Sequence, residues 1–514
     1  MFPPRVALIL LLVELGLLAG ASFSLCRRWG NTHAEAGAYA LLLPLMAVSF
    51  GFEVAFLMGL PAIVRVWELI LIMIAIIILV RNGKPLRDIW RNLVGAVKNH
   101  PATALALLMA TVLLLVQLFS TGPEQIERLM PPAPEGHGVL AGEVPLLPSN
   151  VDVLSLWLIR FHGGVAHTLP AMMALAAIAF ATYALARRYA WPPTAVTVTL
   201  MVISMPRLVC LTSAGSSEII HAAACLLALL MVYRLVERPQ GRDLFLLLMT
   251  VAFAISMTRL QWLFPLLILP MGAVIILRRH GVLFFKAITL RGNLLSVMIA
   301  GVAAALFVTY PLLTRSAYQA GLDGSAWELF LNADGIQGAL ANSVRYLIEA
   351  IHFTRPIDFL VAQIFKNGLV DTINQLYNAW LAPVLGLAGA VAPFQVLWAP
   401  TAKAAWFGPF GILALLPALL YALVRGPRRL KAVALSLVGY FYLMTLIPAW
   451  QPGNVSLFTP LFTAGGFTMA FLLPPWRLSV RAKHFLQALS FVLLFYSLLF
   501  NPFGLLAEHL PISF

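Results

Sequence analysis

Long apolar stretches separated by short polar ones dominate this chain. Apolar runs of roughly 18–22 residues recur from end to end, the length at which a helix crosses a bilayer core of about 30 Å. Strands of a membrane barrel would instead alternate apolar and polar residues. The pattern therefore predicts an all-α polytopic membrane protein. We expect about fourteen spans, near residues 6–25, 37–59, 62–80, 102–120, 166–186, 192–212, 219–236, 243–258, 261–277, 293–312, 405–424, 432–449, 458–475 and 484–502.

Composition and charge agree with a membrane location. Hydrophobic residues make up 61% of the 514 and charged residues only 11%, whereas soluble domains are usually about half apolar. The formal charge of +14 comes largely from Lys and Arg in alternate loops between the expected spans. Such loops face the cytoplasm, so both termini are expected on the other side. The basic balance then indicates contact with anionic lipid and no nucleic-acid partner.

Four regions follow from this topology. Residues 1–100 form an N-terminal three-helix transmembrane addition, and residues 101–312 a transmembrane core with a first external loop at 121–165. A long external segment at 313–404 carries interfacial helices, and residues 405–514 supply the C-terminal transmembrane helices. Within the external segment, the apolar stretch Leu381–Trp398 is expected to be interfacial or re-entrant. If it crossed, the basic cluster at 425–431 would lie outside, against the charge rule.

The two external segments predict a site at membrane depth on the non-cytoplasmic side. The loop at 121–165 concentrates acidic residues in a chain with only 20 of them, and its stretch Val151–Phe161 is expected to form an amphipathic interfacial helix. The segment at 313–404 is rich in aromatic residues that can pack on the membrane surface. Long connections of this kind usually carry function.

Five segments, in their order and sidedness, resemble the GT-C superfamily of membrane glycosyltransferases. They are PSNVDVLSLWL (148–158), TYALARRYAWP (182–192), MPRLVCLTSAGSSEIIHAAACLLAL (205–229), ISMTRLQWLFPLLILP (255–270) and AWQPGNVSLFTPLF (449–462). The resemblance covers about two-thirds of the chain. It implies a GT-C-like core in a bacterial plasma (inner) membrane, similar to the mannosyltransferase-like enzymes that glycosylate proteins or lipid A. It also implies a polyprenyl-phosphate-linked sugar as donor and an acceptor on the non-cytoplasmic face.

Two departures from the family leave a second interpretation open. Family members place an Asp early in the first external loop, where this chain offers Glu124 or Glu127. Many also carry an Arg-Tyr pair before the proline of the late loop. Here SLFT precedes Pro460, so that Arg is absent. The alternative is a catalytically silent subunit of the same fold that scaffolds a membrane complex. Its partner subunit would then bind through the N-terminal helices, where Glu14 and Glu53 pair between helices or contact that subunit.

Sugar transfer from a lipid phosphate requires a base for the acceptor hydroxyl and a cation for the phosphate. We assign Glu124 as the base, with Glu127 as the substitute, and Arg259 as the phosphate ligand, since guanidinium matches phosphate oxygens. The open alternatives are a solvated loop carboxylate for Glu124 and lipid headgroup contact for Arg259. Glu218 is expected either to hold a sugar hydroxyl or to stabilise a helix N-terminus.

Two further residues, His137 and Arg345, are placed in the substrate site, and for Arg345 headgroup contact is the alternative. No metal-ligand set is predicted, because His162 and His167 are five residues apart and do not share a helix face. A divalent metal ion is left open as a cofactor. The chain has neither a phosphate-binding glycine loop nor an HExxH motif, so nucleotide-driven transport and zinc proteolysis are not expected.

Overall fold

The computed structural model describes most of the chain. The described residues are 4–60, 62–82, 108, 111–112, 150–162, 168–257, 262–289, 291–320, 331–350, 361–364, 366–391, 393–394, 407–451, 454–473 and 479–499. Over these ranges the secondary structure is helical, and β-structure is limited to isolated bridges at Leu331–Pro448 and Ala390–Trp450. The prediction of an all-α protein is therefore confirmed for the described part of the chain.

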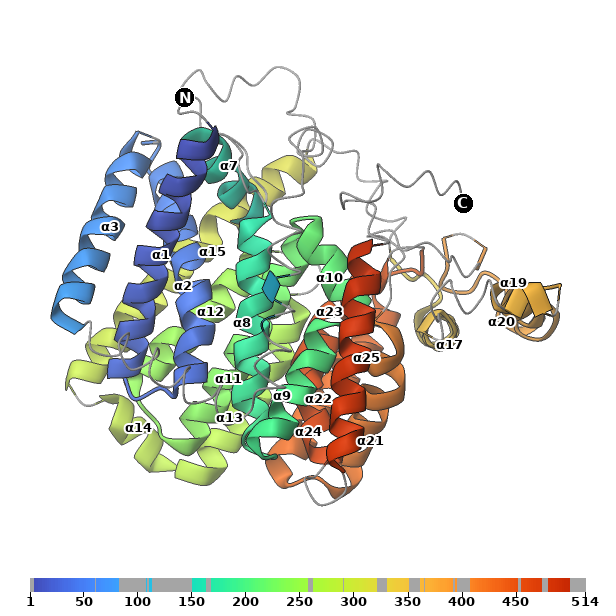
Figure 1. Ribbon diagram of the computed structural model, residues 1–514. Coiled ribbons are helices and arrows are strands. Elements are labelled where there is room, and N and C mark those ends of the chain that lie inside the picture. The colour runs from blue at the N-terminus through green and yellow to red at the C-terminus, as the bar shows by residue number, and fades with distance from the viewer. Residues whose placement is uncertain are drawn as a thin grey trace.

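The elements of the described chain are helices (Figure 1). The first half holds α1 (Pro4–Arg28), α2 (His33–Leu57), α3 (Ile63–Asn82), α7 (Asn150–His162), α8 (Leu169–Ala186), α9 (Pro192–Ile203), α10 (Pro206–Ser213), α11 (Ser217–Glu237), α12 (Gly241–Met257), α13 (Leu263–His280), α14 (Val282–Thr289) and α15 (Arg291–Ala320). The second half holds α17 (Gly335–Ala350), α19 (Leu369–Leu376), the π-helix η1 (Tyr377–Leu381), α20 (Ala382–Leu385), the π-helix η2 (Phe410–Leu415), α21 (Leu416–Arg425), α22 (Arg428–Leu446), the 3-10 helix η3 (Asn454–Phe458), α23 (Thr459–Gly465), η4 (Gly466–Thr468), α24 (Met469–Leu472) and α25 (Val480–Leu499).

Membrane-spanning capacity is present throughout the described part. Eight helical stretches there are long and apolar enough to cross a bilayer, or nine if the bent pair α9 and α10 counts as one span. The expected span at 102–120 lies outside the described residues except for 108, 111 and 112. In the described part of Leu381–Trp398 the helix ends at Leu385, where Gly386 takes a positive φ of 51°.

The expected span at 192–212 is divided into two helices. α9 ends at Ile203, α10 begins at Pro206, and the two axes differ by 59°. Pro206 causes the break, because the proline ring disfavours helical backbone angles for the residue before it. Met205 accordingly has extended backbone angles. Gly408 packs against the bend: a Cβ there would lie 2.9 Å from the Pro206 ring.

α11 forms the centre of the bundle. In its apolar window 94% of residues are buried, and it packs against α8, α12, α13 and α23. Small side chains permit this close packing, as at Gly272 of α13, where a Cβ would lie 2.9 Å from Val232. A helix that is apolar on all sides, as α11 is, belongs inside a helical bundle.

α3 lies at the periphery, beside α1 (Figure 1). Only 11% of its apolar window is buried, so most of its surface is available to lipid. Its contact with α2 depends on Gly51, where a Cβ would lie 1.9 Å from the Trp67 ring. The Trp67 indole N–H donates to the Ala47 carbonyl at 2.9 Å, which fixes the rotation of α3.

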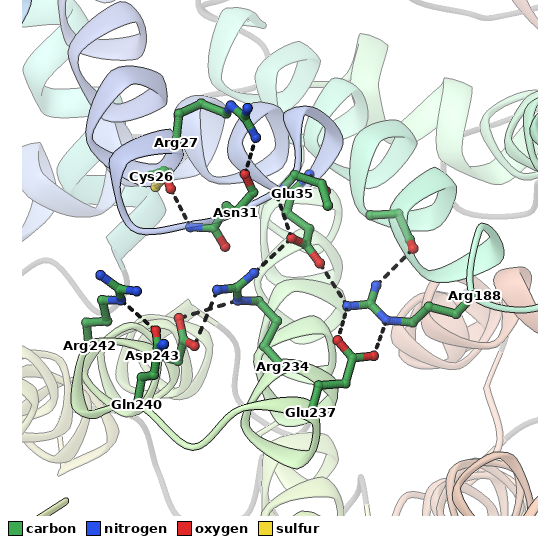
Figure 2. Close-up of polar contacts among 12 residues, drawn as sticks. Cys26, Arg27, Asn31, Glu35, Arg188, Arg234, Glu237, Gln240, Arg242 and Asp243 are labelled. Carbon is green, nitrogen blue, oxygen red and sulfur yellow. Dashed lines mark hydrogen bonds and ion pairs between the residues drawn. The ribbon is translucent and has the colours of Figure 1, made fainter. Parts of the chain in front are cut away.

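A network of charged residues joins α2, α11 and α12 to the turn after α8 (Figure 2). Glu35 of α2 accepts from Arg188 at 2.8 Å and from Arg234 at 2.9 Å, and it also closes a capping box with Thr32. Arg188 contacts Glu237 at 2.8 Å, and Arg234 contacts Asp243 at 3.4 Å. The basic loops near residues 27, 187 and 238 therefore meet at the same end of the molecule.

Candidate functional site

A buried ion pair lies just beyond the break between α9 and α10. The Arg207 guanidinium, in the first turn of α10, contacts the Glu218 carboxylate of α11 at 3.1 Å. Arg207 is 2% exposed, whereas the Glu218 side chain is 24% exposed. A charged pair inside a membrane domain is costly and is usually retained for function. The partial exposure of Glu218 gives this pair an open side.

Local sequence positions both partners. A tight turn at residues 214–216 joins α10 to α11, and Gly215 within it takes a φ of 63°. Ser216 then caps α11 by accepting from the Glu218 backbone N–H at 3.2 Å. The Glu218 carboxylate thus lies in the first turn of a helix, where the dipole favours negative charge. Both interpretations of Glu218 that the sequence left open, helix-end stabilisation and polar contact, are compatible with this position.

The end of α12 lies alongside the start of α11. His221, one turn after Glu218, is fully buried and contacts the Ala254 carbonyl of α12 at 2.9 Å through its Nδ1. α12 ends three residues later at Met257, and α13 begins at Leu263. Arg259 belongs to the connection between these two helices, which lies outside the described residues. Both helices that flank it nevertheless pack against α11.

Three other predicted site residues, Glu124, Glu127 and His137, also lie outside the described residues. Their roles, like that of Arg259, stay predictions. Of the six expected site residues, Glu218 and Arg345 are within the described part of the chain, and they belong to different clusters.

Arg345 lies fully buried in α17 and binds other parts of the segment at 313–404. Its guanidinium donates to the Ala388 carbonyl at 2.6 Å, to the Gly386 carbonyl at 2.9 Å and to the Asn342 side chain at 2.9 Å. It also donates to the Tyr377 hydroxyl at 3.2 Å. These contacts join α17 to η1 and to the turn after α20. The geometry favours a structural role for Arg345 within this segment over contact with a phosphate or a headgroup.

Sequence reasoning missed Arg207 as a functional candidate. It lies within the segment MPRLV, directly after the proline that breaks the helix and 11 residues before Glu218. The available signal was a single Arg placed between apolar residues next to that proline. Burial of Arg207 and its distance to Glu218 depend on how α10 folds back toward α11, which residue spacing does not determine.

A second polar cluster lies between α1, α3 and α7. Glu14, Glu68 and His162 each offer one ligand atom, and these atoms all lie within 4.8 Å of one another. Glu14 therefore pairs between helices, one of the two alternatives that the sequence left open. Glu53 is fully buried, and neither of its carboxylate oxygens has a hydrogen-bond partner in the described structure.

Comparison with known proteins adds no relative: no family model, curated protein or solved structure matches this chain. The candidate site is therefore interpreted from its own residues.

Proposed function

We propose that this protein is an integral membrane glycosyltransferase of the GT-C type. It would move a sugar from a polyprenyl-phosphate carrier to an acceptor on the non-cytoplasmic face of a bacterial plasma membrane. The observation that carries the proposal is the ion pair between buried Arg207 and partly exposed Glu218 at a broken helix. Interrupted membrane helices commonly bind ligands, because backbone and charged groups are available there at membrane depth.

The topology assigned to this function has fourteen spans, with the arginine-rich end in the cytoplasm and both termini outside. Support comes from the network at Glu35, which gathers three of the basic loops at one end. Arg207 and Glu218 lie at the opposite ends of the helices that lead away from that network, since α11 runs from Ser217 to Glu237. In this orientation the pair faces the external leaflet.

The chemistry divides between the two side chains. Arg207 would bind the phosphate of the carrier, because the guanidinium fork matches phosphate oxygens and stabilises charge that develops on the leaving group. Glu218 would accept a hydrogen bond from a sugar hydroxyl. Deprotonation of the acceptor remains assigned to Glu124 or Glu127, and Arg259 remains a second phosphate ligand.

The test uses full-length protein in lipid nanodiscs and a synthetic polyprenyl-phosphate sugar with a labelled glycosyl group. Release of polyprenyl phosphate and labelled product is followed by mass spectrometry. We expect R207Q and E218Q each to lower the initial rate by at least about 100-fold, the usual cost of removing a group that stabilises the transition state. R428Q is the matched control: Arg428 is exposed at the other end of the bundle and should retain the wild-type rate.

Two results would contradict the proposal. If R207Q and E218Q keep the wild-type rate, the ion pair has no part in the transfer reaction. Absence of turnover with every donor tested, together with no polyprenyl phosphate among the lipids that copurify with the wild type, would favour the silent scaffolding subunit instead.

A further inference from the structure

The cluster of Glu14, Glu68 and His162 has the composition of a metal site. It draws one side chain from each of three helices: α1, α3 and α7. Glu14 is 7% exposed and His162 is 5% exposed, while the Glu68 side chain is 14% exposed. One imidazole nitrogen and two carboxylate oxygens are ligands that divalent transition metals accept together, whereas Mg²⁺ and Ca²⁺ prefer oxygen alone.

The two distances from the His162 imidazole exceed the usual range for hydrogen bonds. His162 Nε2 lies 3.4 Å from Glu14 Oε2 and 3.7 Å from Glu68 Oε1, whereas N–H···O bonds fall between about 2.7 and 3.2 Å. Within the described structure, His162 Nε2 and Glu14 Oε1 have no hydrogen-bond partner although both are buried. Two ligands at zinc bond lengths of about 2.0–2.2 Å with tetrahedral angles lie about 3.4 Å apart. The His162–Glu14 distance matches this separation, and the His162–Glu68 distance exceeds it slightly.

Formal charge is compatible with a divalent ion. In the form that binds a metal, with both carboxyl groups ionised and the imidazole neutral, the three side chains carry −2. A divalent cation brings that group to zero, which matters because uncompensated charge is costly in a buried site.

Trp157 of α7 holds two of the three side chains, Glu68 and His162, in place. The Trp157 indole N–H donates to Glu68 Oε1 at 3.0 Å, and the indole ring packs edge-on against the His162 ring, with centroids 5.2 Å apart. Trp157 is itself fully buried. A hydrogen-bonded carboxylate and an immobilised imidazole are the outer-shell features that orient metal ligands.

We propose that Glu14, Glu68 and His162 bind one divalent transition metal ion. Zn²⁺ is the ion to test, because His162 Nε2 and Glu14 Oε2 are separated as two tetrahedral zinc ligands are. The ion would link α1 and α3 to α7. A water molecule would complete a tetrahedral site. This inference is independent of the proposed transferase activity.

The test measures metal stoichiometry in the full-length, tag-free protein. The detergent-purified protein is stripped with EDTA, incubated with Zn²⁺, desalted and analysed by inductively coupled plasma mass spectrometry. We expect about one zinc ion per chain, and a loss of affinity of at least about tenfold in E14Q, E68Q and H162Q. E53Q is the matched control, because Glu53 is a buried carboxyl on the neighbouring helix α2, and it should retain the wild-type stoichiometry.

A spectroscopic measurement on the wild type covers the case in which variants fail to fold. Co²⁺ in place of Zn²⁺ should give the visible absorption of a four-coordinate ion with nitrogen and oxygen ligands, and excess Zn²⁺ should remove that absorption. The inference is overturned if the wild type holds no more zinc than H162Q, if all three variants bind as the wild type does, or if Co²⁺ shows only the spectrum of the hydrated ion.

Discussion

Two of the charged clusters in the described part of the chain are organised differently. At the basic end, Glu35 receives short hydrogen bonds from Arg188 and Arg234, so each of its oxygens has a cationic donor (Figure 2). Between α1, α3 and α7, two carboxylates converge on one imidazole nitrogen at distances longer than hydrogen bonds. In the first cluster, protein side chains alone compensate the carboxylate of Glu35. The second is the cluster for which we propose a divalent cation.

The largest expected effect is at the first cluster. Glu35→Gln removes the charge that compensates two guanidinium groups, and breaking a buried pair on one side costs about 3–5 kcal/mol. We expect a large fall in the thermal unfolding temperature, measured in detergent by intrinsic fluorescence. Glu237→Gln is the control: the Glu237 side chain is 40% exposed and pairs with Arg188, so its loss should cost under about 1 kcal/mol. Equal losses in the two variants would contradict the central role of Glu35.

Another buried carboxyl, that of Glu349 in α17, sharpens the comparison through pH. Burial raises the pKa of this carboxyl from 4.5 to about 8, so the folded protein holds it neutral. The unfolded chain loses that proton above its lower pKa, and stability is therefore lost as pH rises from about 4.5 to 8.

Glu349→Gln should remove this part of the pH dependence. Relative to the wild type, we expect the variant to gain up to a few kcal/mol between pH 5 and pH 8, measured as the difference between the two unfolding temperatures across that range. For Asp371→Asn, at an exposed carboxylate of α19, the difference in unfolding temperature from the wild type should not change with pH. A constant difference for Glu349→Gln as well would show that its carboxyl titrates normally.

The geometry of the second cluster depends on how α3 docks on α2. Gly51→Ala places a methyl group against the Trp67 ring, next to Glu68, and over-packing of this kind costs about 1–3 kcal/mol. We expect a lower unfolding temperature and weaker zinc binding. Gly16→Ala in α1 is the control, because a Cβ there meets nothing within 4 Å. Unchanged zinc affinity in Gly51→Ala would separate α3 docking from the metal site.

The smallest effect is expected for Glu14→Gln without metal. Removing one of the two carboxylates beside the imidazole relieves the repulsion between them and also removes one attraction to the imidazole. In EDTA the free energy of unfolding should therefore change by less than about 1 kcal/mol, which is a small shift of the unfolding temperature. With Zn²⁺ present, the wild type should rise above the variant. A fall in EDTA as large as that of Glu35→Gln would mean that the two clusters are held in the same way.

Local sequence determined the helices and much of their arrangement. Apolar length predicts a spanning helix because the bilayer thickness sets it, and the helices α1, α2, α3, α8, α11, α13 and α22 coincide with expected spans. The alternation of basic loops likewise predicted that the segments near Arg188 and Arg234 would lie on the same face. Both signals are carried by neighbouring residues, so they can be read along the chain.

Tertiary structure decided which charged side chains meet. Arg188 and Glu35 are 153 residues apart, and Trp157 and Glu68 are 89 apart; both contacts depend on the rotation of each helix about its axis and on close approaches such as that at Gly51. The break at Pro206 was visible in the sequence as a proline, but the burial of Arg207 against Glu218 required the fold of α10 back toward α11. Polar groups buried among apolar helices need partners, because leaving them unpaired is costly. The packing of the helices determines which residues become those partners.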